Sequence, residues 1–304
     1  MNFSKYSKLE VIEHPLLITE RALQAYLLPF TSGKTTAGFF DFDDIPSAKD
    51  IATEHAKKLS ETTQITLTTD YGNSDIKDSL AYYEAYGTLM YDDYPWYFNT
   101  KEFLNDFQAA EANPGVIAHF LNINSGGGLA YYLEEVHKVL SAREKPLIVQ
   151  CEMYMCSAAF YLGAPADEIY ATTKFDTIGS IGTMVSFWDL KKYFEKIGFK
   201  WHEHYATEST LKNKRINDML AGKPEDYIEH ELDPIAEQFI EDIKKSRPKA
   251  EHDELYKGQT YNAYEAVEIK LIDGIQSIEE SINTAYEKGM EYAEKKRLQN
   301  QLNF

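Results

Sequence analysis

Two strand-to-turn units lie in the middle of the chain and constrain its fold more than any other feature. In the first, the apolar run 116–123 leads directly into three glycines, Gly126–Gly128. In the second, the apolar run 146–152 leads into Ser157, which is followed by small residues. Residues 129–140 separate the two units and carry apolar side chains at helical spacing. Strands that alternate with helices indicate an α/β fold, in which the two turns are expected to lie side by side.

Backbone amides that no side chain covers, together with those at the start of a helix, form a site for developing negative charge. The glycines lack the Lys-Ser/Thr pair of a P-loop and the third glycine of a dinucleotide fingerprint, so a nucleotide site is disfavoured. A glycine run alone is usually a turn, and a serine at a helix start is usually an N-cap. The combination of the two, with the small pair Ala158–Ala159 behind Ser157, favours a nucleophile beside an oxyanion site.

A serine nucleophile needs a base, and the histidines do not supply an evident one. His119 lies inside an apolar strand, where a satisfied core histidine is expected. His202 and His204 alternate along the predicted strand 199–206, but no third ligand accompanies them, and we expect no metal site. Lys212, in the polar segment that follows, is then the candidate base, and Lys214 remains its rival.

Charge and composition exclude several classes of partner. The net charge of −18 and the pI near 4.9 repel nucleic acid and anionic membranes, so neither is expected as a partner. No run approaches the roughly 18 apolar residues of a membrane helix, and the N-terminus lacks the layout of a secretory signal. Two cysteines, Cys151 and Cys156, are too few for a disulfide framework. We therefore expect a soluble, cytoplasmic protein with reduced thiols.

Four motifs in a fixed order carry a resemblance to a known family: INSGGG, CSAAFYLGAPADEIYA, TIGSIG and YNAYEAVEIKLIDGI. Over about Leu80–Ala285 the chain resembles the signal peptide peptidase A (SppA) family of serine peptidases, which implies a Clp protease/crotonase-like α/β fold. The resemblance implies Ser157 as nucleophile and Lys212 as general base. It also implies an oxyanion hole made by the amides of Gly127 and Ala158, with Gly128 in the same loop.

The chain departs from the family pattern at three places. Gly126 replaces the usual proline, Ala158–Ala159 replaces a more common Gly-Gly pair, and the stretch around Lys212 is only loosely similar. Clp-type peptidases use a histidine about 25 residues past the serine, and the region DTIGSIGTMV has none, which favours a Ser-Lys dyad. A lysine accepts a proton only when it is neutral, and burial is what lowers a lysine pKa from about 10.4. We therefore expect other parts of the protein to shelter Lys212.

The resemblance implies a serine endopeptidase that works by acyl transfer on a polypeptide substrate, without a cofactor. Family members assemble into rings or domes, so a homo-oligomer is expected. The opening of the chain resembles a bacteriophage and prophage branch whose members process capsid or scaffold proteins. Two alternatives stay open: a crotonase-like enzyme that binds an acyl-CoA, and a non-catalytic assembly or scaffold protein that keeps the fold.

The pattern along the chain predicts an N-terminal helical extension over residues 1–62 and a peptidase domain over 63–304. Within the extension we expect helices at 15–30 and 47–60, joined by a linker at 31–44. The segment 63–70 alternates as a strand would. Residues of about 207–250, including a long charged helix at 223–247, are expected to form a lid or an oligomer contact, and a charged helix closes the chain.

Overall fold

The computed structural model describes residues 16–18, 48–73, 75–91, 98–187, 189 and 191–302. Its strands are β1 (Leu16–Ile18), β2 (Leu67–Thr68), β3 (Ser79–Tyr86), β4 (Leu89–Met90), β5 (Phe98–Asn99), β6 (Val116–Ser125), β7 (Gly127–Leu129), β8 (Leu147–Cys156), β9 (Glu168–Ala171), β10 (Thr177–Gly179), β11 (Thr260–Asn262) and β12 (Gly274–Ile275). Its helices are α2 (Ala48–Thr63), α3 (Thr100–Ala112), α4 (Leu133–Ser141), α5 (Ala158–Gly163), α6 (Lys191–Lys196), α7 (Lys214–Leu220), α8 (Glu225–Tyr227), the π-helical turn η5 (Ile228–Leu232), α9 (Asp233–Ser246), α10 (Ala263–Glu268) and α11 (Ile278–Leu302).

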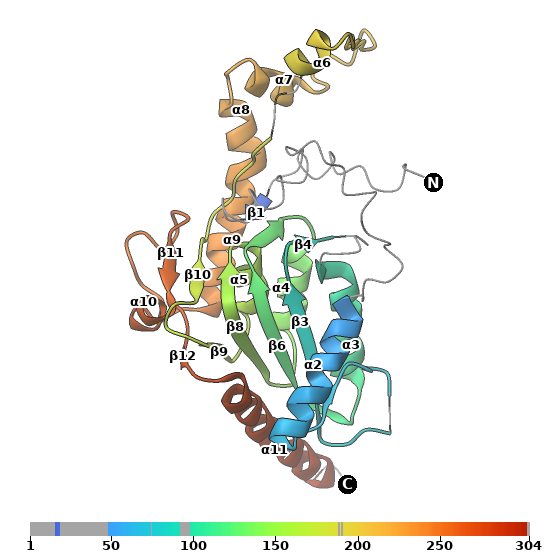
Figure 1. Ribbon diagram of the computed structural model, residues 1–304, viewed down its shortest axis with the longest axis vertical. Helices are drawn as coiled ribbons and strands as arrows, with labels where there is room; N and C mark the ends of the chain where they lie inside the picture. Colours follow the sequence, from blue (N-terminus) through green and yellow to red (C-terminus); the bar gives the residue numbers. More distant parts are fainter. Residues whose placement is uncertain are drawn as a thin grey trace.

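The main sheet is mostly parallel and is built around β3, β6 and β8 (Figure 1). Its order is β11-β10-β8-β6-β3-β2, with β9 beside the first half of β8 and β10 beside the second half. Only the pairing of β10 with β11 is antiparallel within this order. A second sheet of four short strands, in the order β1-β7-β4-β5, lies at the carboxyl end of the central strands. Because β6 and β8 are parallel neighbours, the turns that follow them share one edge of the main sheet.

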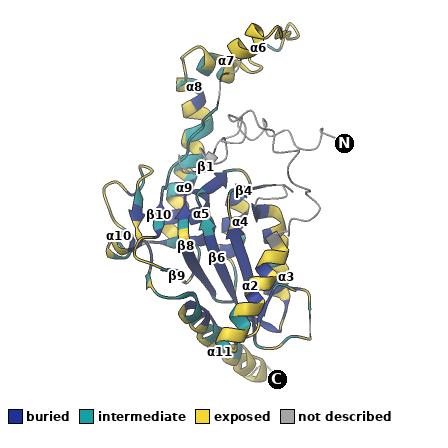
Figure 2. Ribbon diagram, in the orientation of Figure 1, coloured by how far each residue is buried: buried dark blue, intermediate teal, exposed yellow. Residues whose placement is uncertain are grey.

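Helices cover both faces of the main sheet, which explains why its central strands are buried along almost their whole length (Figure 2). On one face, α2 and α11 place small side chains such as Ala52, Ala56 and Ala285 against the sheet, which lets the helices approach closely. On the other face, α3, α4 and α5 bury larger side chains, including Phe103, Phe107, Leu133, Val136 and Phe160. The predicted α/β class is confirmed, and the arrangement is that expected of a Clp protease/crotonase-like domain with C-terminal helices.

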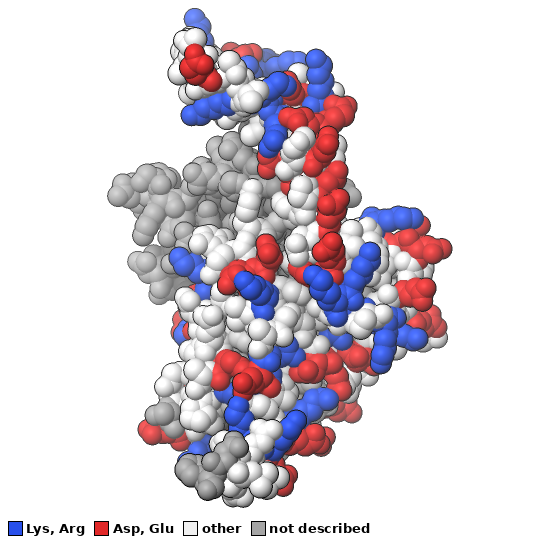
Figure 3. Space-filling view, turned by 180° about the vertical axis from the view of Figure 1, so that it is seen from behind, with Lys and Arg blue, Asp and Glu red and all other residues white. Residues whose placement is uncertain are grey.

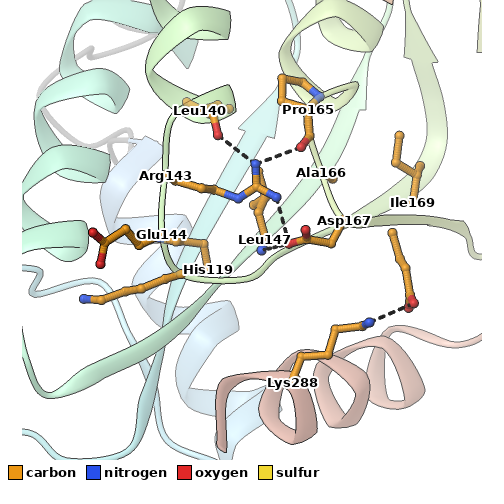
Figure 4. A network of polar contacts seen from close by, with 12 residues as sticks. His119, Leu140, Arg143, Glu144, Leu147, Pro165, Ala166, Asp167, Ile169 and Lys288 are labelled. Carbon is orange, nitrogen blue, oxygen red and sulfur yellow. Dashed lines mark hydrogen bonds and ion pairs between the residues drawn. The ribbon is translucent and has the colours of Figure 1, made fainter. Parts of the chain in front are cut away.

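Arg143 cross-links three segments at the end of the main sheet opposite to the turns that follow β6 and β8 (Figure 4). The Arg143 Nη1 atom donates to the carbonyl oxygens of Leu140 and Pro165, at 2.7 and 2.8 Å. The Nη2 atom donates to Asp167 at 2.7 Å, and the same carboxylate accepts the Leu147 amide at 2.7 Å. One side chain therefore joins the end of α4, the loop before β9 and the start of β8.

A helical projection rises from the end of the body at which the turns after β6 and β8 lie (Figure 1). Helices α8 and α9, joined through η5, form one continuous rod that rises from the body, and α7 and α6 lie beyond its far end. Figure 2 shows that residues 191–223, called the arm below, are almost entirely exposed, whereas the rod is partly buried. Helices α6 and α7 bury none of their residues.

Several predicted elements are confirmed, and two are wrong. The strands 116–123 and 146–152 and the helices 47–60 and 223–247 are present, although β6 and β8 extend further than predicted. The helix predicted over 15–30 is wrong at Leu16–Ile18, which form a strand because they pair with β7. The rest of that helix and the linker 31–44 lie outside the described residues. The strand predicted over 199–206 is wrong, since this exposed part of the arm has no described strand beside it to supply hydrogen bonds.

The described parts of residues 1–62 pack directly on the rest of the body. Helix α2 shares a buried cluster with β3, β6 and α11, and β1 completes the smaller sheet. The strand predicted over 63–70 is reduced to Leu67–Thr68, which pair with the start of β3.

Candidate active site

Ser157 occupies a strained turn between β8 and α5. Its backbone has φ of 57° and ψ of −119°, a combination that costs a non-glycine residue free energy and is kept only where surrounding contacts enforce it. Two such contacts are hydrogen bonds: the Ser157 amide donates to the Gly179 carbonyl at 2.7 Å, and its own carbonyl accepts the Tyr161 amide at 2.9 Å. The sharp turn between a buried strand and a buried helix resembles the geometry that presents a nucleophile in α/β-hydrolases.

The Ser157 hydroxyl is not used to cap the helix. Ser157 stands at the N-cap position of α5, yet its side chain makes no capping bond to the described backbone of that helix. Among the described residues, its Oγ atom makes one long hydrogen bond, which it donates to the Gly182 carbonyl oxygen at 3.5 Å. The hydroxyl therefore does not have, at this turn, the structural role that a serine most often has at a helix start.

Two positions of the glycine turn, Gly127 and Gly128, require glycine for different physical reasons. Gly127 has φ of 109°, which favours glycine. Gly128 lies in β7 directly beside β4, and a Cβ atom there would come within 2.0 Å of the Leu89 carbonyl oxygen. The Gly127 amide, predicted as an oxyanion donor, here donates to Ser125 Oγ at 3.1 Å. A substrate carbonyl would have to take this donor from Ser125.

The start of α5 supplies the second predicted oxyanion donor. The Tyr161 amide makes the first hydrogen bond back to Ser157, so the amides of Ala158, Ala159 and Phe160 precede the intrahelical ladder. Ala158 and Ala159 are fully buried, and α5 contacts β7. The structure thus brings Ser157, Ala158 and the glycine turn onto neighbouring elements, as the sequence predicted.

The TIGSIG motif forms the backbone frame behind Ser157. Strand β10 runs parallel to β8, with Gly179 beside Cys156. Ser180 has φ of 54°, and its amide donates to the Gln259 carbonyl at 2.7 Å, so it forms a turn at the end of β10. This frame holds the Gly179 carbonyl in position to accept the Ser157 amide.

The cysteines beside this turn do not compete with Ser157 as nucleophiles. Cys151 and Cys156 are free thiols and both are fully buried. Burial raises the pKa of Cys156 to about 12 and raises the pKa of Cys151 well above its ordinary value. Since the thiolate is the reactive form, both side chains are inert near neutral pH.

Neither candidate lysine lies near Ser157 in a single chain. Lys212 is exposed in the turn before α7, on the arm, whereas Ser157 is in the body at the start of α5 (Figure 1). The described part of one chain does not shelter Lys212, so the shelter expected for it has to come from elsewhere, and a neighbouring copy in an oligomer stays the prediction. Lys214 is also exposed, and a hydrogen bond and the charge of Asp218 raise its pKa, which favours the protonated form that cannot accept a proton.

A buried polar network that the sequence did not reveal joins α5 to the rod that carries the arm. Tyr161 Oη donates to Asp242 Oδ2 at 2.6 Å. His137 contacts the Tyr161 carbonyl oxygen through Nδ1 at 3.0 Å and the Ser246 hydroxyl through Nε2 at 3.1 Å. Burial lowers the pKa of His137, so its ring is neutral at pH 7. These partners lie far apart in sequence, and no local pattern marks them.

A second buried network confirms the prediction for His119, which is a satisfied core histidine. Its Nε2 atom lies 2.7 Å from Glu111 Oε2, its Nδ1 atom lies 3.0 Å from Tyr83 Oη, and burial lowers its pKa. Burial raises the pKa of Glu111, but hydrogen bonds from His119 and the Glu144 amide outweigh this and hold it at about 2. Within the described ranges, no group of three or more His, Cys, Asp or Glu side chains is placed to hold a metal ion.

No helix in the described part of the chain is both long enough and apolar enough to cross a bilayer.

Comparison with known proteins gives a consistent family. The chain is 26% identical over 198 residues to the Enterococcus faecium protein assigned as a signal peptide peptidase SppA, covering 62% of this chain and 55% of that protein. It is 29% identical over 181 residues to Protease 4 of Haemophilus influenzae, covering 58% of this chain and 29% of that protein. The chain thus spans about half the length, or less, of these relatives.

Among solved structures, similarity is found to the membrane-bound stomatin-specific protease 1510-N in complex with a substrate peptide, with a TM-score of 0.40 and 13% identity over 66% of this chain and 75% of that chain. A peptidase from Plasmodium falciparum has a TM-score of 0.38 and 16% identity over 65% of this chain and 95% of its own. The family model "Peptidase family S49" matches residues 140–291, which include Ser157, the TIGSIG motif and the arm. This match covers half of the chain, which therefore belongs to peptidase family S49.

Proposed function

We propose that this peptidase is a serine endopeptidase in which Ser157 is the nucleophile. The observation that supports the proposal is the strained turn at Ser157, whose hydroxyl makes no capping bond to α5, the helix that contacts strand β7 of the glycine turn. Ser157 Oγ attacks the carbonyl carbon of the scissile peptide and loses its proton to a base. The negative charge that develops on the carbonyl oxygen is held by the amides of Ala158 and Gly127.

The intermediate then collapses, and the protonated base gives its proton to the departing amine. Water attacks the resulting ester between Ser157 and the substrate, with the same base accepting its proton. Release of the acid restores the hydroxyl. Each step needs only one proton carrier beside Ser157 and two amide donors, and no cofactor takes part in it.

We propose Lys212 as this base, supplied by the arm of a neighbouring copy of the chain. The arm exposes several large apolar side chains, and such side chains mark an interaction surface where they gather. Tyr193 is 59% exposed, Phe199 64%, Trp201 71% and Leu211 75%. A neighbouring copy that covers these side chains would also exclude water from Lys212, and such burial favours the neutral amine that a base requires.

Charge supports a second copy as the partner of the arm. Lys and Arg outnumber Asp and Glu over residues 191–223, although the chain as a whole carries a charge of −18. The rod below the arm is acidic, with exposed Glu225, Glu229, Asp233, Glu237 and Glu241. Figure 3 shows Lys and Arg gathered on the arm and Asp and Glu along the rod. A basic arm and an acidic surface on the same chain favour contacts between copies.

A fluorophosphonate probe and an unfolded protein such as casein test the nucleophile. We expect the wild type to react at Ser157, located by mass spectrometry of the labelled peptide, and to cleave casein. The Ser157→Ala variant should lose the label, and its kcat should fall by about 10⁶-fold, as in other serine peptidases. A wild-type protein that neither labels nor cleaves would favour the alternative of a non-catalytic assembly protein.

Mixing two inactive variants tests the base and its origin. We expect Lys212→Ala to be inactive and Lys214→Ala to retain turnover. When Ser157→Ala and Lys212→Ala chains are mixed and reassembled, about a quarter of the sites should combine an intact serine with an intact lysine from another copy. No recovery in the mixture would place both residues of each site in one chain, and full turnover in Lys212→Ala would remove this lysine from the mechanism.

The substrate class that we propose is a capsid or scaffold protein. This part of the proposal rests on the resemblance of the opening residues alone, most of which lie outside the described ranges. Cleavage of candidate capsid and scaffold proteins, compared with casein, would test it.

A further inference from the structure

The strand that carries the glycine turn has one edge that a peptide could join. The inner edge of β7 pairs with β4, where Gly128 is the partner of Leu89. The outer edge pairs antiparallel with β1, so that Leu16, Leu17 and Ile18 lie opposite Leu129, Gly128 and Gly127. An extended substrate that adds a strand beside the predicted oxyanion donor therefore meets a segment of the chain itself.

This internal strand lies beside the nucleophile. Helix α5, which begins directly after Ser157, contacts both β7 and β1. Figure 1 shows β1 at the same end of the body as α5 and β4. A peptide that occupied the position of β1 would thus run past the Ser157 turn.

Two features of the candidate site are those of an enzyme that is not ready to bind substrate. The Gly127 amide is already used by Ser125 Oγ, at 3.1 Å. Ser157 is only 1% exposed, so a substrate carbonyl has no direct path to its hydroxyl. Both features must change before the chemistry can begin, and both lie at the elements that β1 contacts.

We propose that Leu16–Ile18 occupy the substrate-binding edge of β7 and must be displaced by an extended substrate before cleavage. The inference rests on the proposed peptidase function of Ser157. Strand addition uses main-chain hydrogen bonds, which any extended segment can make, so β1 and a substrate compete for the same donors and acceptors. Because β1 is the short terminal strand of its sheet, its exchange leaves the other three strands paired.

A reversible cross-link tests the proposal on the full chain. Leu16 and Leu129 are direct cross-strand partners, and such partners lie within the distance that a disulfide spans. In the double variant Leu16→Cys/Leu129→Cys, oxidation should lower kcat/KM for casein by about tenfold or more relative to the reduced form of the same protein, since the edge then stays closed. Reducing agent should restore it. The single variant Leu16→Cys should respond to neither treatment.

A second variant works in the opposite direction. Leu17→Pro removes a main-chain donor and disfavours the strand, so it should raise kcat/KM for casein several-fold. Equal turnover of the oxidised and reduced forms would overturn the inference, and so would failure of the two cysteines to cross-link or unchanged turnover in Leu17→Pro. These outcomes differ from failure of the proposed function, in which the wild type itself neither labels nor cleaves.

Discussion

Replacement of Gly128 by alanine isolates the contribution of the glycine turn. The added Cβ would lie 2.0 Å from the Leu89 carbonyl oxygen, 2.6 Å from its nitrogen and 2.7 Å from its carbonyl carbon. All three atoms are backbone, so no side chain can rotate away. Non-bonded carbon atoms are most stable at about 3.5–4.0 Å, which means that β7 and β4 must separate by more than about 1 Å. A shift of this size breaks the hydrogen bonds between them.

The magnitude follows from two costs. Overpacking of a tight contact costs about 1–3 kcal/mol, and each lost hydrogen bond costs about 1 kcal/mol more. We expect a loss of roughly 3 kcal/mol in the free energy of unfolding, which lowers Tm by about 5 °C in a chain of this size. Displacement of the Gly127 amide should also slow turnover by about 10²–10³-fold, as does the loss of one oxyanion donor in other peptidases.

The assays are thermal unfolding and the rate of fluorophosphonate labelling at Ser157. Gly72→Ala is the matched control, because a Cβ there meets no described atom within 4 Å and Gly72 lies away from the turn. The control should match the wild type in both assays. A Gly128→Ala variant with wild-type Tm and labelling rate would refute the close contact between β7 and β4 as the reason for this glycine.

Three further predictions concern the buried networks. Glu111→Gln should lose the stability that the low Glu111 pKa provides, about 3 kcal/mol at pH 7. In the wild type this contribution is complete above pH 4.5 and is lost as the pH falls toward 2. The free energy of unfolding in urea should therefore differ less between pH 7 and pH 3 in the variant than in the wild type. Arg143→Ala removes the donor to the carbonyls of Leu140 and Pro165 and should cost about 2–4 kcal/mol in urea unfolding, with little recovery in Arg143→Lys, whose compact ammonium lacks the planar fork that reaches these partners and Asp167. Tyr161→Phe should cost about 1–2 kcal/mol and increase hydrogen exchange in α5 and α9 together; exchange confined to one helix would contradict their coupling.

The centre of the fold could be read from the sequence because its signals are local. The apolar runs 116–123 and 146–152 are long and end in a glycine turn and a serine followed by alanines, so strand, turn and helix were each marked by adjacent residues. The same local logic failed at Leu16–Ile18. Helical spacing favoured a helix there, but pairing with Gly127–Leu129, more than a hundred positions away, makes these residues a strand.

The candidate site was predicted in part for the same reason. Ser157, Gly127 and Ala158 are brought to neighbouring elements by the parallel pairing of β6 and β8, which the alternation of strands and helices implies. The position of Lys212 depends instead on an arm whose helices α6 and α7 bury none of their residues, so neither spacing nor composition could locate it. The alternation over 199–206 was misleading because a strand also needs a neighbour to pair with.

The projecting arm has a consequence for the kinetics of the assembled enzyme. If the lysine of one copy serves the serine of another, a dilute chain is inert and turnover rises more steeply than linearly with protein concentration. Dilution would then stop proteolysis without any inhibitor, and catalysis would begin only where many copies gather. A newly synthesised chain would therefore not cleave other proteins until it had assembled with further copies.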